Sequence, residues 1–120
     1  MRRVLLAIAA VLALLAAAPA SADSDQDFTL VNHTGRPIRA VLLSPASRDH
    51  WGEDMLGAET LSDGAEADIE FPAGTRGCTW DLRVTYGTDE TAEWHGLGLC
   101  NIDQVTLSRD ASGAVRVRVE

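Results

Sequence analysis

The chain has 120 residues, a formal net charge of −8 and two cysteines, and arginine supplies all ten of its Lys and Arg residues. This length fits a single small domain behind a leader, and two cysteines allow one disulfide. So acidic a chain repels nucleic acid and anionic lipid, which argues against both classes of partner.

Residues 1–22 have the pattern of a cleavable signal peptide. Arg2 and Arg3 form the charged end, residues 4–18 are apolar, and Ala20-Ser21-Ala22 supplies the small residues before a cleavage site. The apolar run is shorter than the roughly 20 residues that a membrane span needs. We therefore expect a bacterial protein that is periplasmic or secreted, with no membrane span after cleavage. The paired arginines leave general secretory and twin-arginine export both open.

Removing these 22 residues leaves 98, residues 23–120, which we expect to form one domain. The leader holds two of the ten arginines and none of the 18 acidic residues, so this domain carries a formal charge of −10. Residues 28–33 alternate as a strand, residues 33–37 form a turn, and residues 38–43 return as a second strand. Because residues 38–43 are apolar on both faces, we expect this strand to be central or covered by a loop.

Residues 44–57 lose the two-residue period. Trp51, Met55 and Leu56 fall at helical spacing, which predicts a helical turn or two against the sheet. Two interpretations of Trp51 are open. It plugs an open end of the sandwich above Met55 and Leu56, or it is exposed beside His50 and Arg48 as an anchor for a partner or a sugar ring.

Residues 67–71 alternate as a one-sided strand, and the clearest alternation of the sequence runs from Cys78 to Tyr86. A second run of the same kind begins at Ala92, so the two runs predict a β-hairpin. Because apolar even positions must face each other, we expect Tyr86 opposite Ala92 and Cys78 opposite Cys100. The same register sets Trp80 over Gly98.

The Cys78–Cys100 pair is expected to be a structural disulfide, since an exported domain of this size commonly has such a link. It closes a loop of about 20 residues, for which the chain-entropy model gives about 3 kcal/mol. A redox role is disfavoured, because the sequence has no C-x-x-C motif.

Two further strands around residues 105–107 and 115–119 bring the expected number to about seven. We predict an all-β fold, a small antiparallel β-sandwich with one short helical segment, in which Greek-key connections are one option.

The sequence gives little support for catalysis. No G-x-S-x-G elbow fixes a nucleophile, and the three histidines are far apart along the chain. One alternative function is a calcium or other metal site in the acidic loops, formed by Asp49, Glu53 and Asp54 with Asp63.

Short motifs spread over the whole mature part also resemble a known family. They are residues 28–32, Thr34-Gly35, Ser44-Pro45, Trp51-Gly52, Leu56-Gly57, 78–84 and Leu99-Cys100. In their order and spacing they are similar to a family of short exported bacterial proteins of unassigned function. Some members carry the label of a Tat-pathway signal protein or of argininosuccinate lyase. The lyase label implies a far longer helical enzyme with a Gly-Ser-Ser loop, and this chain has neither feature.

The sequence therefore predicts an exported, non-enzymatic binding or envelope-associated module. Its ligand or partner is an unidentified protein or small molecule, and we expect no cofactor. The residues expected to contact the partner are Trp51, His50 and Arg48.

Overall fold

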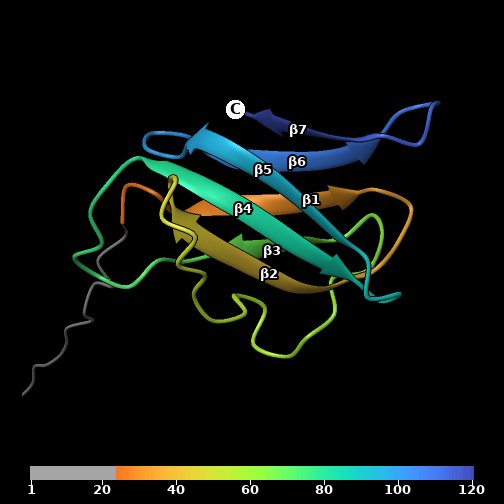
Figure 1. The fold of residues 1–120 in the computed structure, drawn as a ribbon, viewed down its shortest axis with the longest axis horizontal. Coiled ribbons are helices and arrows are strands. Elements are labelled where there is room, and N and C mark those ends of the chain that lie inside the picture. The colour runs from red at the N-terminus through yellow and green to blue at the C-terminus, as the bar shows by residue number, and fades with distance from the viewer. Residues whose placement is uncertain (1–23) are drawn as a thin grey trace, which may run out of the picture.

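The computed structural model describes residues 24–120, so the expected signal peptide lies outside the described part (Figure 1). The seven strands are β1 (Phe28–His33), β2 (Ile38–Pro45), β3 (Glu66–Ile69), β4 (Thr79–Tyr86), β5 (Thr91–Gly98), β6 (Gln104–Arg109) and β7 (Val115–Val119). No helix in this part of the chain is long and apolar enough to cross a membrane.

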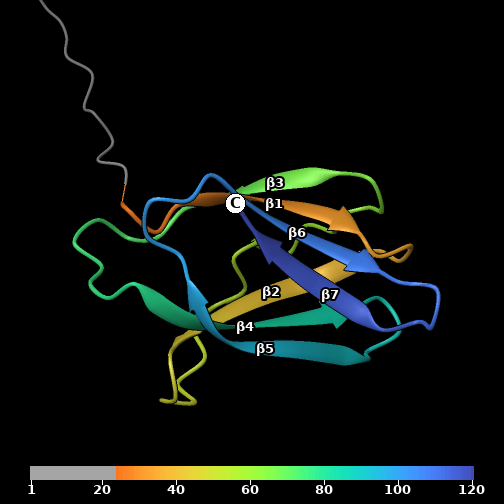
Figure 2. The same ribbon diagram turned by 90° about the horizontal axis from the view of Figure 1, so that it is seen from above.

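The strands form two sheets that lie face to face. One sheet has the order β3-β1-β6-β7 and the other has the order β2-β4-β5. Figures 1 and 2 show the two layers from perpendicular directions. The seven strands, their sandwich-like arrangement and their approximate positions confirm the prediction from two-residue alternation.

One strand pairing differs from the expected antiparallel sandwich. Strands β1 and β6 run parallel, with Leu30 beside Val105, while the other four pairings are antiparallel. A parallel pair needs a long crossover connection, and here the whole β2-β4-β5 sheet lies in the chain between the two strands. The alternation of apolar and polar residues within one strand does not indicate whether that strand pairs in a parallel or an antiparallel direction with its neighbour.

The core fills the space between the sheets with alternate residues of both. The most deeply buried apolar side chains include Leu30, Ile38, Val41, Ile69, Leu82, Val84, Leu99, Val105 and Leu107. At one end of the sandwich, the rings of Phe71 and Trp80 pack edge to face with centroids 5.0 Å apart.

The register predicted for the β4–β5 hairpin is wrong. Asp89 has a left-handed backbone (φ 73°), and the Tyr86 N–H donates to the Glu90 carbonyl at 2.8 Å, so the hairpin closes with a loop of residues 87–89. This shorter loop sets Val84 opposite Ala92, where the predicted register had Tyr86 opposite Ala92.

A bulge then changes the register again before the strands reach the cysteines. It lies in β5, where His95 and Gly96 together face the single residue Asp81, and the φ of Gly96, 72°, favours glycine. Beyond it Trp80 pairs with Leu97, so the predicted Trp80–Gly98 contact is also wrong.

The disulfide itself is confirmed. Cys78 and Cys100 are joined with their Cα atoms 5.0 Å apart, just outside the paired residues of β4 and β5. The Leu99 N–H donates to the Cys78 carbonyl at 2.8 Å, so the backbone ladder continues up to the disulfide. It fastens the open end of the hairpin, opposite the loop of residues 87–89.

Residues 46–60 form turns, and the helical segment predicted there is wrong, since residues 24–120 contain no helix. The N–H groups of this segment bond to the free edge of β2: Gly52 donates to the Leu43 carbonyl at 3.0 Å and Met55 to the Val41 carbonyl at 2.7 Å. Strand β2 is therefore an edge strand, so the central position considered for it is wrong, and the loop covers its edge.

Candidate functional site

The candidate site lies on the outer face of the β2-β4-β5 sheet, away from the core. Odd-numbered residues of β4, and those of β5 before the bulge at Gly96, point outward there, because successive side chains of a strand alternate between faces. Trp51 reaches this face from the loop after β2, and the Arg83 guanidinium carbon lies 4.3 Å from the centroid of its ring. We call Trp51, Asp81, Arg83, Glu93 and His95 the Trp51 surface.

Charged side chains form a connected row beside the indole. Arg83 Nε donates to Glu93 Oε2 at 2.7 Å, a cross-strand pair set by the register of the hairpin. His95 Nε2 lies 3.4 Å from the other oxygen of Glu93, and His95 Nδ1 lies 3.2 Å from Asp81 Oδ2. The row therefore runs from the Arg83 guanidinium to Glu93, His95 and Asp81, with the imidazole between the two carboxylates.

Asp81 is the buried member of the row, with only 3% of its surface exposed. Its Oδ2 accepts the Ser47 N–H at 3.1 Å, and its Oδ1 accepts the Gly96 N–H at 2.9 Å. Burial by itself would raise the pKa of this carboxyl, but the two N–H groups and His95 outweigh it and hold the pKa below its ordinary value. Asp81 thus joins the loop of Trp51 to the bulge in β5.

The loop that carries Trp51 has an unusual backbone. Ser47 and Asp49 both have left-handed φ angles, 65° and 48°, although neither is glycine. Hydrogen bonds compensate for this conformation: the His50 N–H donates to Ser44 Oγ at 2.9 Å and Trp51 Nε1 donates to Asp49 Oδ1 at 2.8 Å. Strained loop residues that are held in place in this way often occur at binding sites.

Comparison with known proteins supports the fold alone. No protein-family model matches the chain, and no curated protein sequence matches it. A solved structure that is similar is a bacterial protein of unknown function from Eubacterium rectale, determined by NMR. Its identity is 20% and its TM-score 0.55, and the match covers 78% of this chain and 85% of that chain. The family resemblance noted from the sequence is therefore supported only as a fold shared with a bacterial protein of unknown function.

The structure separates the three residues expected to contact a partner. Trp51 is half-buried and is not among the residues that pack against the core, and Arg48 is exposed. His50 is exposed as well but borders a cavity on the other side of the loop. Met55 and Leu56 do pack against the core. The plug interpretation of Trp51 is therefore wrong, since its ring lies over Arg83.

Asp81, Arg83, Glu93 and His95 were missed as site residues. The polar residues that alternate along both strands contained the signal, because residues of one parity share a face. The sequence could not show that the loop would bring Trp51 onto that face.

Three of the four acidic residues considered for a metal form hydrogen bonds of their own elsewhere in the structure. Asp54 accepts the N–H groups of Val41 and Leu56, both at 2.9 Å, and Asp63 accepts the Gly35 N–H at 2.8 Å. Asp49 bonds to Trp51, and Glu53 borders the cavity near His50. Within residues 24–120 no group of three or more His, Cys, Asp or Glu side chains is placed to hold a metal ion.

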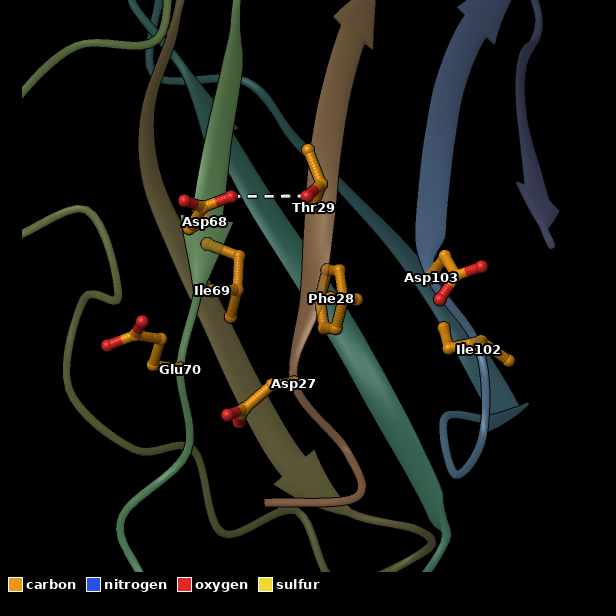
Figure 3. A pocket seen from close by; sticks show the side chains of 8 residues that line it. All are labelled: Asp27, Phe28, Thr29, Asp68, Ile69, Glu70, Ile102 and Asp103. Carbon is orange, nitrogen blue, oxygen red and sulfur yellow. Dashed lines mark hydrogen bonds between the residues drawn. The ribbon is translucent and has the colours of Figure 1, made fainter. Parts of the chain in front are cut away.

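A second acidic region lies on the other sheet, in a shallow cleft beside β1 and β3. Figure 3 shows that its carboxylates surround the cleft without converging, and Asp68 accepts the Thr29 hydroxyl at 3.1 Å. Asp27 Oδ1 accepts the Phe71 N–H at 2.7 Å, so this carboxylate holds the chain after β3. The carboxylates thus line the cleft separately and do not converge on one site.

Proposed function

We propose that this protein is an exported, non-enzymatic binding module that contacts its partner through the Trp51 surface. The observation that carries the proposal is the position of the Trp51 ring, which lies outside the core above Arg83. A tryptophan in a small domain contributes most to stability when it is buried in the core. Here a strained loop places it on a charged sheet face instead, and Trp and Arg are the residue types most often found at binding hot spots.

The charges of the surface indicate the chemistry of the partner. Asp49, Glu93 and His95 offer hydrogen-bond acceptors or donors around the indole, and the domain as a whole is strongly acidic. A neutral or cationic partner that stacks on an aromatic ring fits this arrangement, whereas an anionic partner is repelled. Binding is favoured over catalysis because the His95 side chain is 64% exposed and both of its nitrogens face carboxylates.

A crosslinking pull-down from the native periplasm tests the proposal. The bait is the exported protein, and the variants are Trp51→Ala, Trp51→Phe and Arg116→Ala. The last is the control, because Arg116 is exposed and lies on β7 in the other sheet. We expect the Trp51→Ala bait to lose partners that the parent and Arg116→Ala baits both recover, and Trp51→Phe to retain part of them. Equal recovery by Trp51→Ala would refute the proposal.

The Trp51→Ala bait must remain folded for this comparison. Because the half-buried ring lies outside the core over the partly exposed Arg83 guanidinium, we expect its removal to cost about 1–2 kcal/mol of unfolding free energy. Urea denaturation followed by circular dichroism measures this cost. A much larger loss would show that Trp51 has a structural role.

A further inference from the structure

A cavity of 310 Å³ lies on the core-facing side of residues 46–57, at the end of the sandwich. It is separate from the Trp51 surface, which occupies the other side of the same segment. Its apolar wall consists of Leu43, Pro45, Met55, Phe71, Pro72 and Trp80. Several of these side chains belong to the core, so the cavity extends inward from the surface to the core.

The indole, hydroxyl and backbone N–H groups of the wall already have partners, and the polar side chains that remain there, His50 and Glu53, are exposed. Trp80 Nε1 donates to the Gly77 carbonyl at 2.9 Å, and the Thr75 hydroxyl donates to the Pro72 carbonyl at 2.6 Å. The Gly52 and Met55 N–H groups bond to the edge of β2. An occupant therefore gains few hydrogen bonds from the wall, and a hydrocarbon or aromatic group loses least on entering it.

The same hydrogen bonds exclude an extended peptide as the occupant. A peptide that adds to a sheet needs free backbone groups along an edge strand. On this edge of β2, the Val41 and Leu43 carbonyls are already occupied by Met55 and Gly52. A small molecule therefore fits the cavity better than a strand of another protein.

Charge further restricts the ligand. Glu53 lines the cavity and the domain carries a large negative charge, so a ligand carboxylate is repelled and must also give up its hydration. The edge-to-face pair of Phe71 and Trp80 provides aromatic contacts, and the flexible thioether of Met55 can adjust to a ring.

From these observations we infer that the cavity binds a small, neutral aromatic molecule. Apolar cavities of about 150 Å³ accept benzene, and ligand pockets begin at about 300 Å³, so the volume allows one substituted ring. This site is independent of the proposed function of the Trp51 surface.

Toluene is a suitable probe, with benzoate as its charged counterpart. In methyl NMR spectra of the protein purified from the periplasm, we expect toluene to shift the signals of Leu43 and Met55 in a saturable way. Val117 lies on β7 in the other sheet, and its methyl signals are expected to stay in place. Benzoate is expected to bind at least about tenfold more weakly, a difference of about 1.4 kcal/mol.

Two tryptophan variants show whether the cavity is the site. Met55→Trp fills the cavity and is expected to abolish the saturable shift at Leu43. Leu56→Trp is the matched control, because Leu56 borders a different groove beside Glu59, and it is expected to retain the shift. If Met55→Trp does not fold, Met55→Phe fills part of the same space and is expected to weaken binding.

Three results would each overturn the inference. They are the lack of a saturable shift up to the solubility limit of toluene, undiminished binding in the cavity-filling variants, and equal binding of benzoate. Trp51→Ala is expected to bind toluene as the parent does. The two proposals can therefore fail independently. A negative pull-down does not count against the cavity, and a failure of toluene to bind does not count against the proposed role of the Trp51 surface.

Discussion

Replacing both Cys78 and Cys100 with serine is expected to lower the free energy of unfolding by about 2–5 kcal/mol. The disulfide joins the two ends of a hairpin that belongs to a sheet of only three strands. Without it, the unfolded chain gains the freedom of a loop of about 20 residues, which the chain-entropy model equates with about 3 kcal/mol. Small domains have a net stability of about 5–15 kcal/mol, so the loss is a large share of the total.

Urea denaturation of the double variant, beside the parent with and without a thiol reductant, measures this effect. Reduction of the parent is expected to produce a similar loss, because the same restraint is removed without a change of side chain. Intact mass of the parent purified from the periplasm should show no free thiol. Unchanged denaturation curves in both experiments would contradict the stabilising role of the disulfide.

Asp81→Ala is expected to cost about 2–4 kcal/mol, since each buried donor left without an acceptor costs about 1–3 kcal/mol. The substitution removes the acceptor of the Ser47 and Gly96 N–H groups, so it loosens both the loop of Trp51 and the bulge of β5. Asp68→Ala is the matched control, because Asp68 is exposed and has a single hydrogen bond to Thr29. Its expected effect is below about 0.5 kcal/mol. Equal losses in the two variants would contradict this role of Asp81.

The same carboxylate makes stability depend on pH. The pKa of Asp81 in the folded protein lies below the ordinary value of 3.8, so its charged form contributes stability above that value. This contribution is lost as the pH falls through the folded-state pKa. We therefore expect the difference in unfolding free energy between the parent and Asp81→Asn to shrink from about pH 5 toward about pH 2. A difference that stays constant over this range would contradict the expectation.

Alternation predicted most of the strands because each has one buried and one exposed face. It could not predict how strands from distant parts of the chain pair. The register of the hairpin depended on two backbone conformations, the left-handed φ of Asp89 and the positive φ of Gly96. Asp tolerates the left-handed region without requiring it, so Asp89 indicated the short loop less clearly than a glycine would have.

Part of the Trp51 surface could have been predicted as well. Trp51 was recognised as unusual because it falls outside the strand alternation, and the polar residues of β4 and β5 were recognised as one face. The helical spacing of Trp51 and Met55 was misleading, since these two side chains lie on opposite sides of an extended loop. The Asp54 carboxylate and the edge of β2 accept N–H groups of this segment that a helix would have used internally.

The parallel pairing of β1 with β6 determines when folding can be completed. Strand β1 lies between β3 and β6, so its sheet lacks a central contact until Gln104–Arg109 has been synthesised and can return to the start of the domain. Contacts between such distant segments slow folding, because a long stretch of chain must be ordered first. The β3-β1-β6-β7 sheet of a nascent chain is therefore expected to form only after its last strands emerge, so one half of the sandwich stays open while the chain is being synthesised.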